Sequence, residues 1–350
     1  MSRSNSTAAP RRAGPRPRGR SIAVTGAAGF LGRRLLARLE AEPSVERILA
    51  LDLKPPPGQL RKTVFERIDL ASSRTDVVVA QALRAHEIDT LVHLALFFNP
   101  IQNAAYAHEV EVIGTLQLLG AAAAVKLGAF IVCSTTALYG AHPDNPNYLR
   151  EDQPLRPPLH SRYLSDKLEV EKQVTAFAAQ HPKVRVALLR LGAILGPSVK
   201  NPSTRLFGKT LVPVVLGRDP LMQFLHEEDA IEALFLAALA RPVGPLNIVP
   251  PGVLPLSSVL HLLGRTPLPL PTPLAQLGLG TLWSMFGVGT PPSWLDFLRY
   301  LWVADGGRAT EAIGLNYRFT TRQAVLAFGA SLGTAAPKPP DALAEVARGA

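Results

Sequence analysis

The sequence predicts an α/β protein, with a doubly wound parallel sheet followed by a smaller C-terminal substrate-binding domain. From residue 21 to about 190, short apolar runs alternate with helical patterns, which is typical of a parallel sheet with helices on both faces. A glycine-rich turn follows the first apolar run. After residue 190 the alternation ends and prolines become frequent, which indicates a change of architecture.

The expected strands are the apolar runs 21–25, 46–52, 63–67, 89–95, 129–133 and 184–190. Between the fourth and fifth runs the sequence predicts one long helix, 101–126, filled by alanine and leucine. Right-handed crossovers bring the carboxyl ends of parallel strands to one edge of the sheet, where such folds bind ligands. A ligand crevice is therefore expected at that edge.

The composition is that of a folded protein with a basic end. The chain has 350 residues, 47% of them hydrophobic and 18% charged, which excludes a wholly disordered chain. Residues 1–20 contain six arginines and no acid, so without them the formal charge of +10 falls to +4. We expect 1–20 to be a disordered basic tail and 331–350 to be a second tail. No specific nucleic-acid partner is expected.

Neither a membrane span nor a disulfide is predicted. No apolar run reaches the roughly 20 uncharged residues that a span requires. The apolar, glycine-rich segment 274–302 is expected to be a packed helical subdomain; a lid over an apolar substrate and contact with a membrane surface are the less favoured alternatives. The single cysteine, Cys133, lies in an apolar run and cannot form an intramolecular disulfide. We therefore expect a reducing, cytoplasmic location.

The glycine-rich turn is typical of a dinucleotide-binding site. Residues 25–32 read TGAAGFLG, between an apolar run and a helical pattern. Gly26 is expected to make the tight bend, Gly29 to approach a pyrophosphate, and Gly32 to pack the helix on the strand. Phe30 and Leu31 begin that helix beside the cofactor. The order of run, turn and helix predicts a Rossmann-type NAD-binding domain over residues 21–190.

The choice between NAD and NADP depends on Asp52. This residue ends the second apolar run, about 20 residues beyond the glycines, where a carboxylate accepts hydrogen bonds from a ribose diol. The same carboxylate repels a 2′-phosphate, so NAD is favoured over NADP, although Lys54 nearby weakens that preference.

Candidate catalytic residues follow the fifth strand. Ser134 and Thr135 come directly after that run, and either hydroxyl is placed to orient a substrate oxygen. Tyr163 and Lys167 are four residues apart, so on a helix they share a face. The Lys167 ammonium is expected to favour the phenolate of Tyr163, which then exchanges a proton with a substrate hydroxyl.

These features resemble an extended short-chain dehydrogenase/reductase of the NAD-dependent epimerase/dehydratase family over about residues 21–330. The resemblance implies an interleaved substrate-binding region over 191–330, a small-molecule substrate, and a homodimer through helices 101–126 and 161–180. It implies that Thr135 is the catalytic Ser/Thr and that Tyr163 and Lys167 also contact the cofactor. The further matching residues are Asp69 and Leu70, implied to lie beside the adenine, His93, Leu94, Ala95, Tyr139, Gly140, Arg190, Gly196, Pro197 and 224–229.

Departures from the family bear on the substrate. Ala193 stands where nucleotide-sugar enzymes of the family have asparagine, and Met222 where they tend to have arginine. Glu111 replaces an asparagine of the fourth helix. The substrate is expected to be either a nucleotide sugar or a less polar, sterol-like alcohol. The aromatic residues available for the second are Phe97, Phe98, Trp283, Phe286 and Trp294.

Other functional classes have less support. A non-catalytic NAD-binding scaffold or sensor is the alternative to an enzyme. No metal site is expected, because His93 has no second ligand at metal spacing. Residues 226–229 are acidic, but acids at this position are typical of the first turn of a helix.

Overall fold

The computed structural model describes residues 19–58, 60–159, 161–277 and 292–333. Its centre is a seven-stranded sheet in the order β11-β6-β5-β4-β1-β2-β3, and every neighbouring pair is parallel. The predicted doubly wound sheet is confirmed. The strands are β1 (Arg20–Thr25), β2 (Val45–Asp52), β3 (Thr63–Arg67), β4 (Thr90–His93), β5 (Ala129–Thr135), β6 (Arg185–Leu191) and β11 (Gly244–Ile248).

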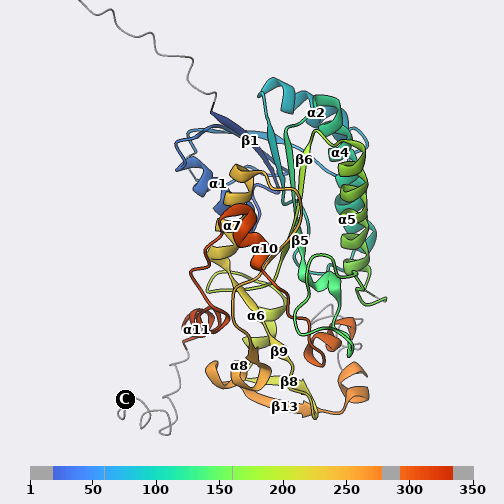
Figure 1. The fold of residues 1–350 in the computed structure, drawn as a ribbon, viewed down its shortest axis with the longest axis vertical. Helices are drawn as coiled ribbons and strands as arrows, with labels where there is room; N and C mark the ends of the chain where they lie inside the picture. Colours follow the sequence, from blue (N-terminus) through green and yellow to red (C-terminus); the bar gives the residue numbers. More distant parts are fainter. Residues whose placement is uncertain (1–18, 59, 160, 278–291, 334–350) are drawn as a thin grey trace, which may run out of the picture.

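Helices cover both faces of the sheet, as Figure 1 shows. One layer packs α1 against α7 and α7 against α10, and the other packs α4 between α2 and α5. Along β1, Val24 faces the first layer and Ala23 the second. Both are fully buried, as expected for a strand covered on both faces. The helices are α1 (Phe30–Glu40), α2 (Thr75–Ala85), α4 (Gly114–Val125), α5 (Arg162–Gln180), α7 (Glu227–Ala240) and α10 (Gly307–Ile313).

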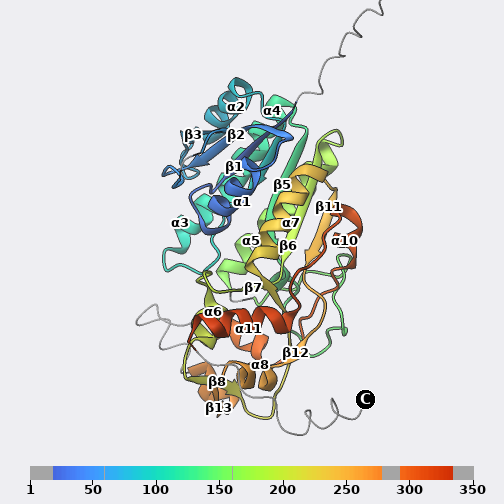
Figure 2. The ribbon, with the colours of Figure 1, turned by 90° about the vertical axis from the view of Figure 1, so that its left-hand side faces the viewer.

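The C-terminal half of the chain contributes to the central sheet and also forms a smaller lobe. β11 extends the sheet by pairing with β6, so the sequence boundary at residue 190 is not a boundary in space. The remaining elements form a smaller lobe below the sheet in Figure 2, around a core of its own that includes Phe207, Phe224 and Phe328. They are β7 (Ala193–Leu195), α6 (Pro202–Phe207), β8 (Leu211–Val215), β9 (Leu221–Met222), β10 (Phe224–His226), β12 (Leu254–Pro255), α8 (Leu256–Leu262), β13 (Thr266–Leu270), η3 (Pro292–Leu298) and α11 (Thr321–Ser331).

The long helix expected at 101–126 is not one regular α-helix. It consists of α3 (Ala104–His108), a π-helical turn η1 (Glu109–Ile113) and α4. The helix starts at Ala104 because the Asn103 side chain accepts a hydrogen bond from the Tyr106 N–H. A π-turn contains one more residue than an α-turn and often occurs at functional sites. Here it contains Glu111, whose side chain is buried.

Several other boundaries differ from the predictions. The fourth strand is shorter than 89–95, and the fifth continues to Thr135. α11 ends at Ser331, so that residue belongs to a helix and not to the predicted tail. Residues 1–18, 334–350 and 278–291, with Trp283 and Phe286, lie outside the described residues. Of the helices that are described, none is long and apolar enough to span a bilayer.

Candidate active site

The glycine turn brings the end of β1, the start of α1 and the end of β4 into close backbone contact. Gly26 has a φ of +67°, and a Cβ there would lie 2.7 Å from the Leu94 carbonyl oxygen at the end of β4. A Cβ on Gly32 would lie 2.1 Å from the Gly26 carbonyl oxygen. Gly29 is the N-cap of α1 and supplies no side-chain acceptor. The first N–H groups of α1 therefore remain available to an anion such as a pyrophosphate.

A cavity of about 240 Å³ lies along this turn. Its described lining contains two carboxylates, Asp52 and Asp69, and no lysine or arginine. Asp52 accepts hydrogen bonds from the backbone N–H of Ala28 at 2.9 Å and of Lys54 at 3.3 Å. Lys54 is not among the described residues that line the cavity. The two carboxylates and the free N–H groups at the start of α1 fit the ribose and pyrophosphate of NAD. The cavity is lined by each of the predicted cofactor residues Gly26, Gly29, Phe30, Leu31, Gly32, Asp52, Asp69, Leu70, Leu94 and Ala95.

A second cavity, of about 540 Å³, contains the three candidate catalytic residues, Thr135, Tyr163 and Lys167. It adjoins the first cavity, because both are lined by Phe30, Leu31, Leu96, Phe97 and Phe98. A cavity of this size is ordinary for a small-molecule site. The carboxyl end of the sheet thus places a cavity large enough for a small molecule next to the cavity along the glycine turn.

The two hydroxyls at the end of β5 have different surroundings. Ser134 donates a hydrogen bond of 2.5 Å to Glu171 and is buried. Thr135 is the N-cap of η2 (Thr136–Tyr139), and its Oγ1 accepts from the Ala137 N–H at 3.2 Å. The hydroxyl proton of Thr135 is not used in that bond. Of the two hydroxyls, the one of Thr135 thus keeps a proton that neither of these bonds uses.

Tyr163 lies beside a buried ion pair. The Lys167 Nζ is 4.9 Å from the centre of the Tyr163 ring and 3.1 Å from Glu111 Oε1. Burial raises the pKa of Tyr163 to about 12, Lys167 opposes this increase, and Glu111 adds to it. Burial would lower the pKa of Lys167, but Glu111 and Tyr163 raise it overall. The expected pull of Lys167 on the phenol is present, but burial outweighs it.

The wall of the second cavity combines aromatic and polar groups. Trp294 of η3 packs on Tyr163 with ring centres 6.2 Å apart, so the described end of the 274–302 segment contributes to this site. Ala193 also lines the cavity, whereas Met222 is in the core of the smaller lobe and does not line it. The expected effect of Met222 on substrate binding is therefore not supported. The polar groups of the lining include Arg33, Asn99, Ser198, Lys200, Asn201 and Ser203.

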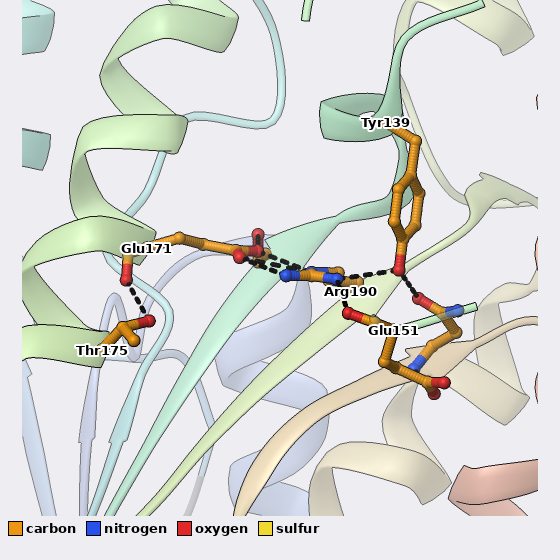
Figure 3. Close-up of polar contacts among 7 residues, drawn as sticks. Tyr139, Glu151, Glu171, Thr175 and Arg190 are labelled. Atoms are coloured by element: carbon orange, nitrogen blue, oxygen red, sulfur yellow. Dashed lines mark hydrogen bonds and ion pairs between the residues drawn. The ribbon is translucent and has the colours of Figure 1, made fainter. Parts of the chain in front are cut away.

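A buried polar network lies behind the end of β5, shown in Figure 3. Arg190 donates to Glu171 at 2.8 Å and to the Tyr139 hydroxyl at 2.8 Å. Tyr139 in turn donates to Asn247 of β11 at 2.8 Å. Burial raises the pKa of Tyr139, although Arg190 opposes this. The network joins η2, β6, β11 and α5, and it reaches β5 through Ser134, which donates to Glu171. Glu171 is a member that the sequence analysis did not identify.

The remaining polar candidates are structural. His93 bonds to Thr25 at 2.7 Å and Thr115 at 3.0 Å, and burial, followed by Lys167, lowers its pKa to about 3. Cys133 lies in the cavity wall, and burial raises the pKa of its thiol to about 12. The helix start expected at 226–229 is confirmed, because His226 caps α7. Among the described residues, no cluster of three or more His, Cys, Asp or Glu side chains is suited to a metal.

Comparisons with known proteins give the family of this chain. The model of the NAD dependent epimerase/dehydratase family matches residues 22–248. Uncharacterized protein Rv0501 of Mycobacterium tuberculosis is 32% identical over 317 residues, which cover 87% of this chain and 81% of that protein. UDP-glucuronic acid decarboxylase 6 of Arabidopsis thaliana is 28% identical over 248 residues, which cover 66% of this chain and 69% of that protein.

Solved structures share the fold. MoeE5 in complex with UDP-glucuronic acid and NAD has a TM-score of 0.66 at 23% identity, covering 89% of this chain and 98% of that one. The dTDP-glucose 4,6-dehydratase DesIV from Streptomyces venezuelae, solved with NAD, has a TM-score of 0.67 at 19% identity, covering 89% and 96%. The alternative of a non-catalytic scaffold is set aside. The chain belongs to the NAD-dependent epimerase/dehydratase family and is an enzyme whose cofactor is NAD.

Proposed function

We propose that this enzyme oxidises a carbinol carbon of a small-molecule substrate in the cavity of about 540 Å³, either transiently or as a net reaction. The observation that carries the proposal is that Thr135, Tyr163 and Lys167 line this one cavity, next to the NAD site. When bound, NAD supplies the acceptor for the hydride.

The three residues have separate tasks in this proposal. Thr135 donates a hydrogen bond to the substrate oxygen and orients it. Tyr163 exchanges a proton with the substrate hydroxyl. Lys167 stabilises the phenolate form, and each unit by which it lowers the pKa of Tyr163 corresponds to about 1.4 kcal/mol. Trp294, packed on the Tyr163 ring, excludes water from that side of the phenol.

The first candidate substrate class is a nucleotide sugar. Lys200, Asn201 and Ser203 line the cavity and offer a positive charge and hydrogen bonds to phosphate and sugar oxygens. The similarity to enzymes named for UDP-glucuronic acid supports the same class. We therefore propose a nucleotide sugar as the first substrate class for this chain.

The second candidate is a less polar, sterol-like alcohol. Ala193 offers no hydrogen bond where family members have asparagine, and Phe97, Trp294 and Trp302 make part of the cavity wall apolar. Apolar walls of this kind bind ring systems by burial of surface.

A substrate panel separates the two classes. Purified protein with NAD is incubated with UDP-glucuronic acid, UDP-glucose and a set of sterols, while reduced cofactor is followed by absorbance and products by chromatography. Conversion of a UDP-sugar without sterol oxidation would support the first class and exclude the second. Chromatography also separates net oxidation from epimerisation. Failure of every carbinol tested would contradict the proposed reaction.

The role of Tyr163 is tested by Tyr163→Phe, which removes the acid/base group and keeps the ring against Trp294. We expect NAD binding to be retained and turnover to fall by about 10²–10⁴-fold. Tyr148→Phe is the matched control, because Tyr148 is 53% exposed and lies outside the described lining of this cavity. Equal turnover of the two variants would exclude Tyr163 as the acid/base.

The location and assembly predicted from the sequence remain proposals. Cytoplasmic location is tested by cell fractionation. A homodimer through the 101–126 and 161–180 helices is tested by light scattering, and Leu116 of α4, which is 52% exposed, is a site for a disruptive charge. A monomeric wild-type protein would contradict the dimer.

A further inference from the structure

The π-helical turn η1 places a carboxylate directly on the lysine of the active site. The Glu111 side chain is 1% exposed and Lys167 is 7% exposed. Glu111 Oε1 accepts from the Lys167 ammonium at 3.1 Å and from the Phe97 backbone N–H at 2.5 Å. Because both donors hold the same oxygen, the carboxylate is fixed next to the ammonium. Glu111 forms no part of the catalytic set considered above.

Few charged groups act on Tyr163. Lys167 lies on its own helix, Glu111 comes from η1, and Cys133 comes from β5. The Cys133 thiol, with a pKa raised to about 12 by burial, is neutral at physiological pH. The neighbour from η3 is Trp294, which carries no charge. Among the described residues that act on Tyr163, the positive charge of Lys167 is therefore opposed by one negative charge, that of Glu111.

The carboxylate of Glu111 has its own surroundings. Burial raises its pKa and Lys167 lowers it, while the nearby charge of Asp166 raises it further. Asp166 is itself held by His108 at 2.9 Å and Arg162 at 3.2 Å. The Asp166 charge is thus partly balanced by Arg162, and the closest partner of Glu111 remains Lys167.

We propose that Glu111 cancels the charge of Lys167, so that Tyr163 keeps its proton in the cofactor-free enzyme and becomes a base only when oxidised NAD is bound. This inference rests on the proposed role of Tyr163 as acid/base. A cationic nicotinamide adds a positive charge that favours the phenolate, and the phenol proton leaves to water. In the oxidation, the substrate hydroxyl proton passes to the Tyr163 oxygen and the hydride passes to NAD. The cofactor then no longer carries the cationic ring, so the neutral phenol is again the favoured form.

The test is an ultraviolet titration of tyrosinate. For wild type and for each variant, the spectrum of the same protein with Tyr163→Phe added is subtracted, so that the signal of Tyr163 remains. Without cofactor, Tyr163 of the wild-type protein should not ionise below pH of about 12. With oxidised NAD its titration should move down by at least about one pH unit, a tenfold change in proton affinity. With reduced NAD it should not move. By linkage, the wild-type affinity for oxidised NAD should rise with pH in that window, and Tyr163→Phe should abolish the rise.

Glu111→Gln removes the charge, while its amide oxygen can still accept from Lys167 and Phe97. We expect Tyr163 in this variant to ionise at least about one pH unit lower than in wild type without any cofactor. Glu109→Gln is the matched control, because Glu109 lies on the same π-turn but is exposed; it should titrate as wild type. If Glu111→Gln does not fold, the wild-type comparison of oxidised with reduced NAD decides.

Two results would overturn the inference: an unchanged Tyr163 titration in folded Glu111→Gln, or equal effects of oxidised and reduced NAD on the wild-type titration. Failure of the proposed function is a separate outcome. In that case Tyr163→Phe would retain turnover, whatever the titrations show.

Discussion

Replacing Arg190 with methionine should destabilise the protein strongly, because it breaks a buried ion pair. The side chains of Arg190 and Glu171 are 7% and 4% exposed. Arg190 donates to both carboxylate oxygens, at 3.1 Å and 2.8 Å, and to the Tyr139 hydroxyl. Arg190→Met leaves Glu171 buried with the Ser134 hydroxyl as its remaining side-chain donor.

The magnitude follows from this burial. Removal of one partner of a buried pair typically costs about 3–5 kcal/mol, because the other charge stays uncompensated. Removing the second charge as well, in Arg190→Met with Glu171→Gln, should recover at least about 1 kcal/mol of that loss. The two substitutions are therefore expected to be non-additive.

The assay is urea unfolding followed by circular dichroism, with the free energy of unfolding extrapolated to water. The matched control is Arg156→Met, which breaks an exposed pair with Asp144, where the side chains are 40% and 66% exposed. This control should lose at most about 1 kcal/mol. If Arg190→Met loses no more than Arg156→Met, the buried network of Figure 3 does not stabilise the fold as argued.

Three further predictions concern the cofactor site and the N-terminus. Gly32→Ala should weaken NAD binding at least about tenfold, because the added Cβ would lie 2.1 Å from the Gly26 carbonyl oxygen. Calorimetry measures the affinity against the control Gly120→Ala, whose Cβ would make only ordinary contacts. Equal affinities of the two variants for NAD would contradict the prediction. Asp52→Asn keeps an acceptor for the Ala28 N–H but removes the negative charge, so the preference for NAD over NADP should fall about tenfold. An unchanged ratio of the dissociation constants for NAD and NADP would refute the role of the carboxylate. Deletion of residues 1–18 should leave NAD affinity and the unfolding midpoint unchanged, and a loss of either would show that the basic segment serves the enzyme.

Much of the fold could be predicted because its signals are local. The apolar runs predicted the first six strands of the sheet to within a few residues, since a strand buried on both faces is continuously apolar. The glycines at 26 and 32 were predictable because their close backbone contacts exclude a side chain. Asp52 was predictable from the same strand–turn–helix–strand unit, because it ends β2, which pairs with β1.

Other features depend on contacts that sequence patterns do not contain. The π-turn at Glu109–Ile113 was not predicted, because the apolar pattern of the long helix does not reveal one additional residue in a turn. Glu111 was noted only as a departure from the family, and its pairing with Lys167 was missed. Glu171 was missed for a similar reason: it lies on a helix, and only the position of Arg190 on β6 makes it a buried partner.

The parallel sheet, the glycine turn and the acid at the end of β2 could be predicted from the sequence, because the patterns that indicate them lie in short stretches of the chain. Only the folded chain shows which partner each hydroxyl at the end of β5 has and which charges surround Tyr163. Ser134 and Thr135 both line the cavity, but the Ser134 hydroxyl donates to Glu171, whereas the Thr135 hydroxyl accepts from the Ala137 N–H. Glu111 and Lys167 are 56 residues apart and meet only because η1 packs on α5. Burial then makes their charges strong, since low-dielectric surroundings screen them little.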